Sequence, residues 1–155
     1  MNTPLFIAAI IVSFLGMELV SYLAHRYIYH GIGWRFHESH HTKRKGVFEK
    51  NDVFPAFFAT TTMTLMMLSL QLPSLAWLLP FSIGISAYGV LYFIVHDLYV
   101  HRRSKRFRPR LQFLIPVKKA HAIHHRYGGE PYGLLFYFRD DVYRRERDVT
   151  EDEVV

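Results

Sequence analysis

The 155-residue sequence contains no cysteine, and its basic residues are missing from two long stretches. Without thiols, the chain has no disulfide scaffold, iron–sulfur cluster, thiolate-ligated haem or cysteine nucleophile. Lys and Arg are absent from residues 1–25 and 51–101, so all 19 lie in two blocks, at 26–50 and 102–147. Half of the residues are hydrophobic. This composition excludes a disordered chain and disfavours an ordinary soluble domain.

The uncharged stretches predict membrane-spanning helices. Residues 4–24 contain one charged residue, Glu18, and a helix of this length crosses a hydrocarbon core of about 30 Å. Residues 53–95 contain no Asp, Glu, Lys or Arg. This stretch is too long for one span and fits a hairpin of two, at about 53–72 and 76–100.

The two basic blocks predict the topology, because cytoplasmic loops of membrane proteins are enriched in Lys and Arg. Three crossings place both blocks on the cytoplasmic side and the N-terminus outside. We expect one domain over residues 1–155, an all-α integral membrane helical bundle of three to four transmembrane helices, with a charged tail at about 139–155. Beside these apolar spans, the lipid bilayer is the expected partner and nucleic acid is not. The oligomeric state stays open.

All ten histidines fall into two spacings, H-x4-H and H-x2-H-H, and each spacing occurs twice. In chain order the four boxes are His25 and His30; His37, His40 and His41; His96 and His101; His121, His124 and His125. Histidines three and four residues apart project from one helical face, so each H-x2-H-H cluster presents three imidazoles to one region. Residues five apart lie about 140° apart around an α-helix, so each pair suits a helix end or two different ions.

The boxes predict a histidine-rich cap that holds two metal ions at the cytoplasmic edge of the membrane. Gly31 and Gly33 follow the first pair, where a helix should end. Imidazole suits Fe, Zn, Cu and Ni, and ten histidines are too many for a four-ligand structural zinc site. Two six-coordinate ions would take five histidines each and leave two positions for water, a bridging oxygen or O2. Iron is the natural redox choice, and Zn or Ni can replace it in recombinant protein.

The order of the boxes resembles the fatty acid hydroxylase superfamily of membrane di-iron oxygenases, and within it the bacterial-type β-carotene 3-hydroxylases. The match runs roughly over residues 4–138, and one departure follows the last box, where residues 128–133 (GGEPYG) replace the cysteine-containing sequence expected there. The stretches that carry the resemblance are 16–18 (GME), 24–31 (AHRYIYHG), 37–41 (HESHH), 44–52 (RKGVFEKND), 87–97 (AYGVLYFIVHD), 100–101 (VH) and 120–125 (AHAIHH).

This resemblance implies an O2-dependent non-haem di-iron monooxygenase that hydroxylates the β-ionone rings of a carotenoid at C3, giving zeaxanthin through β-cryptoxanthin. It also implies two electrons per hydroxylation from a ferredoxin or similar donor with an NAD(P)H-dependent reductase. A carotenoid ketolase, or another lipid hydroxylase or desaturase of the superfamily, is an alternative. A membrane metal carrier is the non-enzyme alternative, and it is disfavoured because the histidines collect at one membrane edge.

Two acids and three aromatic residues are candidates for supporting roles. Ligating histidines usually donate their other ring N–H to a carboxylate or carbonyl. Glu18 lies two helical turns before His25 and Asp97 lies four residues before His101, so each acid is expected to orient one imidazole; helix packing and an interfacial acid are the alternatives. The candidates for contact with a polyene, with packing as the alternative, are Tyr88, Tyr92 and Phe93.

Overall fold

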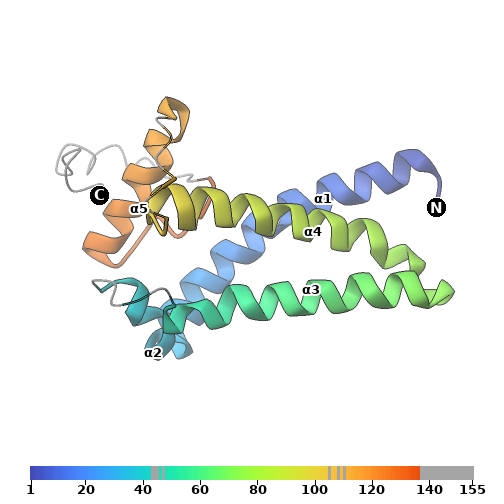
Figure 1. The fold of residues 1–155 in the computed structure, drawn as a ribbon, viewed down its shortest axis with the longest axis horizontal. Helices are drawn as coiled ribbons and strands as arrows, with labels where there is room; N and C mark the ends of the chain where they lie inside the picture. The colour runs from blue at the N-terminus through green and yellow to red at the C-terminus, as the bar shows by residue number, and fades with distance from the viewer. Residues whose placement is uncertain (43–45, 47, 105, 108, 110, 137–155) are drawn as a thin grey trace. The chain divides into compact units, whose positions relative to one another are not determined.

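The computed structural model describes residues 1–42, 46, 48–104, 106, 107, 109 and 111–136 (Figure 1). Within these residues the regular structure is helical and contains no strand, which confirms the all-α class. Three helices are long and apolar enough to cross a membrane, at Thr3–Ile32, Lys50–Gln71 and Pro73–Val100. The chain is therefore a membrane protein. The predicted tail at 139–155 lies outside the described residues.

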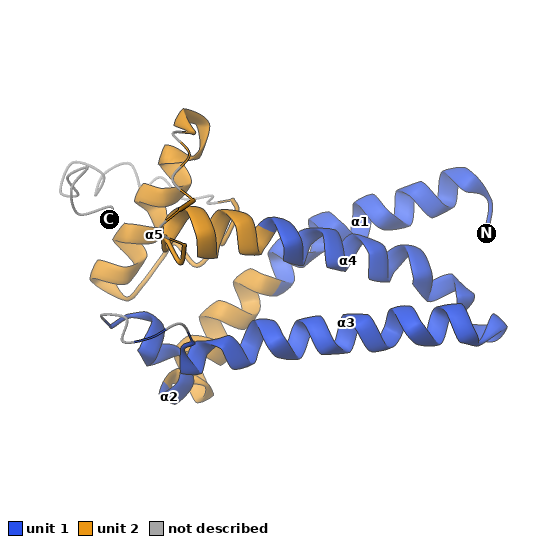
Figure 2. Cartoon of the chain, in the orientation of Figure 1, with its two compact units in different colours: residues 1–20, 35–91 blue, residues 21–34, 92–155 orange. Residues whose placement is uncertain are grey.

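The helices contribute to two compact units, shown in two colours in Figure 2. Unit 1 comprises residues 1–20 and 35–91, and unit 2 comprises residues 21–34 and 92–155. Each unit therefore joins segments that are far apart in the sequence. The first and third long helices each begin in unit 1 and end in unit 2.

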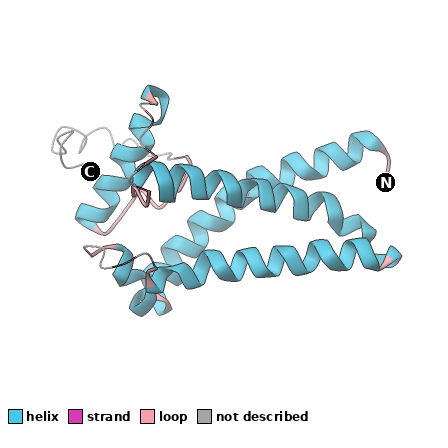
Figure 3. Cartoon of the chain, viewed as in Figure 1, coloured by secondary structure: helices cyan, strands magenta, loops and turns pink. Residues whose placement is uncertain are grey.

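Long helices dominate unit 1. They are most of α1 (Thr3–Leu23), all of α3 (Val53–Gln71) and most of α4 (Leu79–Tyr92). The short turn η4 (Pro73–Leu78) joins α3 to α4, and the two helices run antiparallel (Figure 3). Pro73 opens this turn, where its fixed φ and missing N–H suit a helical start.

Within unit 1, α1 and α4 approach each other closely. A Cβ atom on Gly84 would overlap Ser13 Oγ and the Ile10 carbonyl oxygen, so only glycine fits there. The Tyr88 hydroxyl donates a 2.7 Å hydrogen bond to Glu18 Oε2, and both side chains are buried. Small residues and polar side chains of this kind are typical of contacts between membrane helices.

Short elements of unit 1 carry the first H-x2-H-H cluster. Helix α2 (Trp34–His37) is followed by the 3₁₀ turn η2 (Glu38–His40). A second 3₁₀ turn, η3 (Lys50–Asp52), leads directly into α3. The Asp52 carboxylate accepts a hydrogen bond from the Glu49 N–H at 3.0 Å and so caps η3.

Both H-x4-H pairs belong to segments that wind as π-helices, η1 (Ala24–Ile32) and η5 (Phe93–Val100) with its cap at His101. In a π-helix each N–H bonds to the carbonyl five residues back. The His101 N–H accordingly donates to the His96 carbonyl at 2.9 Å. Residues five apart therefore lie on one face, where an α-helix would have separated them. Helical dihedral angles are interrupted at Gly31, where the helix was predicted to end.

The last helix of unit 2 carries the second H-x2-H-H cluster. The 3₁₀ turn η6 (Gln112–Leu114) leads into α5 (Ile115–Tyr127). Helix α5 ends at Gly128, whose φ of 69° lies in the left-handed region that favours glycine. This turn sends the chain back toward the histidines.

Candidate metal centre

Three histidines of unit 2 form a first imidazole group, His25, His30 and His124. Each offers one ring nitrogen, and these nitrogens all lie within 4.8 Å of one another. The Nε2 atoms of His30 and His124 are 3.0 Å apart. The side chains of His25 and His124 are almost completely buried. An H-x4-H pair and one residue of an H-x2-H-H cluster thus meet, although nearly a hundred residues separate them in the chain.

A second imidazole group in unit 2 consists of His96, His101 and His121. Their ring nitrogens also lie within 4.8 Å of one another, and the Nε2 atoms of His101 and His121 are 2.7 Å apart. The ring of His125 lies 4.4 Å from that of His121 and 5.0 Å from that of His101. The cluster on α5 is therefore shared: His124 joins the first group, and His121 joins the second.

The remaining three histidines lie together in unit 1. The Nε2 atoms of His37 and His41 are 3.2 Å apart, and the rings of His37 and His40 are 5.4 Å apart. His37 Nδ1 is 2.7 Å from Asn51 Oδ1, and His40 Nδ1 is 3.3 Å from Glu49 Oε2. These two partners escaped the sequence reasoning. The sequence could have indicated them by their position just before an apolar span, within the stretch 44–52 that carries the family resemblance.

Three histidines of unit 2 donate a hydrogen bond through Nδ1. His25 Nδ1–H donates to the Tyr132 carbonyl at 2.9 Å, and His124 Nδ1–H donates to the Gly129 carbonyl at 2.6 Å. His96 Nδ1–H donates to Asp97 Oδ1 at 2.8 Å. Because a carbonyl can only accept, Nδ1 of His25 and His124 must carry the proton, and Nε2 keeps the lone pair that binds a metal.

The donor set fits a metal ion. Two nitrogens at right angles, each about 2.1 Å from one ion, lie about 3.0 Å apart, which is close to the Nε2 separations in the imidazole groups. Burial, with smaller contributions from the neighbouring histidines, holds the pKa of His121 well below the ordinary value for histidine. A neutral imidazole is the form that binds a metal, and imidazole suits Fe, Zn, Cu and Ni.

The two predicted acids have well-defined partners. Asp97 Oδ1 accepts from Nδ1–H of the neighbouring His96, and Asp97 Oδ2 accepts from Arg103 Nη1 at 2.8 Å. The orientation of His101 by Asp97 stays a prediction. Glu18 accepts the bond from Tyr88 described above.

The predicted aromatic residues occupy three different settings. Tyr88 is buried against Glu18 in unit 1. In unit 2, the Tyr92 ring stacks on His96 with centroids 4.6 Å apart, and Phe93 is 46% exposed. One aromatic residue was missed. The Tyr132 ring lies within 5.4 Å of each ring in the first imidazole group.

Comparison with known proteins identifies the family to which this chain belongs. The chain matches the fatty acid hydroxylase family over residues 10–144, a stretch that includes all four histidine boxes. The chain belongs to the fatty acid hydroxylase family. The resemblance seen in its motifs is thereby confirmed. No solved structure gives a significant match to this chain.

Several curated relatives of this chain carry a more specific name than that of the family. The beta-carotene hydroxylase of Pantoea ananas is 42% identical over 131 residues, which cover 83% of this chain and 73% of that protein. The beta-carotene hydroxylase of Paracoccus sp. (strain PC1) is 36% identical over 132 residues, with 83% and 80% covered. The chloroplastic beta-carotene 3-hydroxylase of Haematococcus lacustris is 38% identical over 128 residues, covering 78% of this chain and 40% of that protein.

Proposed function

We propose that this protein is a β-carotene 3-hydroxylase, which hydroxylates the β-ionone rings at C3 and gives zeaxanthin through β-cryptoxanthin. One observation carries the proposal: buried, all-imidazole donor groups lie in a chain that is similar to bacterial beta-carotene hydroxylases over most of both lengths. Each hydroxylation consumes one O2, two electrons and two protons, replaces one C–H bond by C–OH and releases one water.

We propose two iron ions as the cofactor, held by all ten histidines. Bound iron would supply the activation of O2 and the oxidising power that no side chain provides. Four of the six imidazoles in the two groups are buried and two are half-buried, and together they supply nitrogen donors for the metal. Asp97 orients His96 through its Nδ1–H. We assign Glu18 the role of supporting, through its bond to Tyr88, the end of α1 that leads into η1 and its two histidines.

We propose that the substrate reaches the site from the bilayer, because β-carotene dissolves in lipid. Tyr92 stacks on His96 and Phe93 is half-exposed, so both are candidates for contact with the polyene. The electrons come from a ferredoxin or similar donor with an NAD(P)H-dependent reductase. We place the histidine boxes and the basic blocks on the cytoplasmic side, where such a donor is found, and the N-terminus outside.

Pigment analysis tests this function. The full chain is expressed in a bacterial host that accumulates β-carotene, beside the His40→Ala variant, and carotenoids are separated by liquid chromatography. We expect zeaxanthin and β-cryptoxanthin with the parent chain. His40→Ala should give less than about a hundredth of this product, because loss of a metal-site residue removes the oxidising centre.

Three other results would each contradict one part of the proposal. Canthaxanthin or echinenone would make the enzyme a ketolase and keep the metal site. Unchanged β-carotene, with inserted and iron-loaded protein, would exclude a carotenoid substrate. Near-parental product from His40→Ala would show that its box does not bind catalytic metal.

A further inference from the structure

The segment after the last histidine box folds back onto the first imidazole group. It runs from Gly128 to Tyr132 and is here called the strap. Gly128 starts it with a left-handed turn, in which its N–H donates to the His124 carbonyl at 2.8 Å. The turn brings the next residues of unit 2 over histidines that come from two distant parts of the chain.

The strap contacts the imidazoles through its backbone. Its Gly129 carbonyl accepts from His124 Nδ1–H at 2.6 Å, and its Tyr132 carbonyl accepts from His25 Nδ1–H at 2.9 Å. One loop of five residues therefore fixes the tautomer of two histidines of the first imidazole group. Hydrogen bonds of this kind hold a ligating ring in place and normally involve a carboxylate or a carbonyl.

The Glu130 side chain holds the strap against the helix that carries His25. Glu130 Oε1 accepts from the Tyr22 hydroxyl at 2.7 Å and from Arg26 Nη1 at 2.8 Å. Its Oε2 accepts from the Tyr132 N–H at 3.2 Å. Tyr22 and Arg26 are one helical turn apart, and Arg26 also donates to the Tyr22 hydroxyl at 2.7 Å. The Glu130 side chain is mostly buried, with 17% exposed, whereas the side chain of its partner Arg26 is 40% exposed.

The Tyr132 ring covers the same group of histidines. Its centroid lies 5.4 Å from that of His25, 5.1 Å from that of His30 and 5.2 Å from that of His124, and each pair of rings is steeply inclined. Displacement of the strap would therefore remove two hydrogen bonds and a packing surface together. In the second imidazole group, His96 Nδ1–H donates to Asp97 on η5, which lies outside the strap.

We propose that Glu130 is a positioning residue for the first imidazole group, and that the strap it anchors fixes His25 and His124 for metal binding through the Gly129 and Tyr132 carbonyls. This inference rests on the proposed function, because it assumes that the group holds one of two metal ions. It assigns the two ions different supports. The first depends on the strap, and the second depends on Asp97 of η5.

Metal release from the purified full-length protein tests the proposal. The parent, Glu130→Ala and Glu130→Gln are loaded with Co²⁺ in detergent, and loss of the Co²⁺ absorption bands is followed after addition of excess EDTA. Glu130→Ala should release one of two equivalents about 10- to 100-fold faster, the usual effect of losing a partner of ligating histidines. It should also alter the absorption bands of the Co²⁺ ion at the first imidazole group. The Co²⁺ ion at the second imidazole group should be released at the parental rate. Glu130→Gln keeps an oxygen acceptor for Tyr22 and Arg26 but turns an NH2 toward the Tyr132 N–H, so release of the Co²⁺ ion at the first imidazole group should be about three- to tenfold faster than in the parent and slower than in Glu130→Ala.

A different release pattern overturns the inference. Parental rates in Glu130→Ala would exclude a positioning role, and equal acceleration of both equivalents would indicate a general loosening of the fold. If Glu130→Ala fails to fold, Tyr22→Phe removes one hydrogen bond to the carboxylate and should speed the same equivalent by about three- to tenfold. An unchanged rate in Tyr22→Phe would then overturn the proposal.

The pigment assay separates this inference from the function on which it rests. A parent chain that hydroxylates β-carotene and holds two Co²⁺, with no effect of Glu130→Ala, overturns only the role of the strap. A parent chain that holds no Co²⁺ and makes no hydroxylated product overturns both.

Discussion

Asp97 joins a histidine of the second imidazole group to an arginine from the basic block that follows it. Its two carboxylate oxygens accept from His96 Nδ1–H and from Arg103 Nη1, both at 2.8 Å, and the Arg103 N–H donates to the Asp97 carbonyl at 2.9 Å. The carboxylate is mostly buried, so the charged arginine balances it in a poorly hydrated site. This arrangement holds the His96 ring in one orientation and leaves its Nε2 for a metal.

Removal of the Asp97 carboxylate should weaken the proposed metal site at the second imidazole group. In Asp97→Ala, His96 loses its orienting partner and Arg103 loses its counter-charge, so metal affinity should fall by about 10- to 100-fold. Asp97→Asn keeps an oxygen that accepts from His96 and should lose less. Metal content per protein after dialysis, measured by mass spectrometry of the elements, checks both variants. Two retained metals in Asp97→Ala would disprove the role of this carboxylate.

The residues of the candidate metal centre were easier to predict from the sequence than their hydrogen-bond partners. The repeated spacings identified all ten histidines as a set, and the structure gathers six of them into two groups in unit 2. The Nδ1 partners of His25 and His124 were not predictable, because both are backbone carbonyls and every residue has one. Asn51 and Glu49 were missed since they lie outside the histidine boxes, and their contacts depend on how η3 follows α2.

At the scale of whole helices, α4 offers a matched pair of glycines. A Cβ on Gly84 would overlap α1 at Ser13 and Ile10, whereas a Cβ on Gly89 meets no heavy atom of the described residues within 4 Å. Gly84→Ala should therefore lower the free energy of unfolding by about 1–3 kcal/mol, the usual cost of overpacking. Gly89→Ala should be neutral or slightly stabilising, because alanine favours a helix over glycine.

Thermal unfolding of both variants in the same detergent, followed by circular dichroism, checks this pair. The parent chain provides the reference, and hydroxylase activity should decline only in Gly84→Ala. An equal midpoint for the two variants would show that α1 and α4 do not pack at Gly84 in the membrane protein.

The π-helical winding of η1 and η5 was beyond sequence reasoning. Hydropathy predicts where a span ends by loss of apolar residues, so the first span was placed at 4–24, whereas the helix continues to Ile32. Past residue 23 the helix continues with a wider π-helical turn, which brings the ring centroids of His25 and His30 within 5.1 Å of each other. Periodicity analysis assumes one helical period, and a local change of period escapes it.

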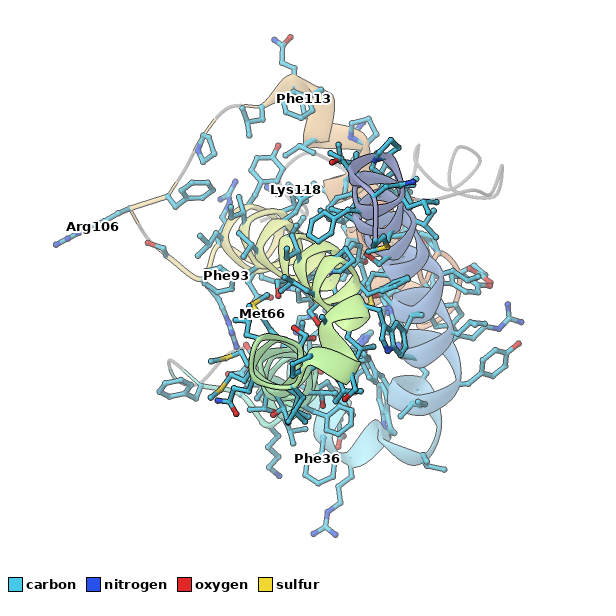
Figure 4. The ribbon with its side chains drawn as sticks, turned by 90° about the vertical axis from the view of Figure 1, so that its right-hand side faces the viewer. Phe36, Met66, Phe93, Arg106, Phe113 and Lys118 are labelled. Carbon is cyan, nitrogen blue, oxygen red and sulfur yellow. The ribbon has the colours of Figure 1, made fainter. Side chains whose placement is uncertain are left out.

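On the scale of the whole molecule, charge distribution predicts which side of the membrane each segment occupies. The α3–α4 turn at Ser74 lies in a stretch without Lys or Arg, and the segment near Arg106 is strongly basic. The Arg106 side chain points away from the helices (Figure 4). With three crossings, the turn at Ser74 should face the outside and Arg106 should face the cytoplasm.

The absence of cysteine makes this topology directly testable. Ser74→Cys and Arg106→Cys each introduce a single thiol at an exposed position, and a membrane-impermeant maleimide is added to intact cells. Ser74→Cys should be labelled in intact cells, whereas Arg106→Cys should be labelled only after permeabilisation. The cysteine-free parent controls for background, and hydroxylated product from each variant shows that it is folded. Labelling of Arg106→Cys in intact cells would reverse the topology and place the basic blocks beyond the reach of a cytoplasmic ferredoxin. The electron donor would then have to lie outside or within the membrane.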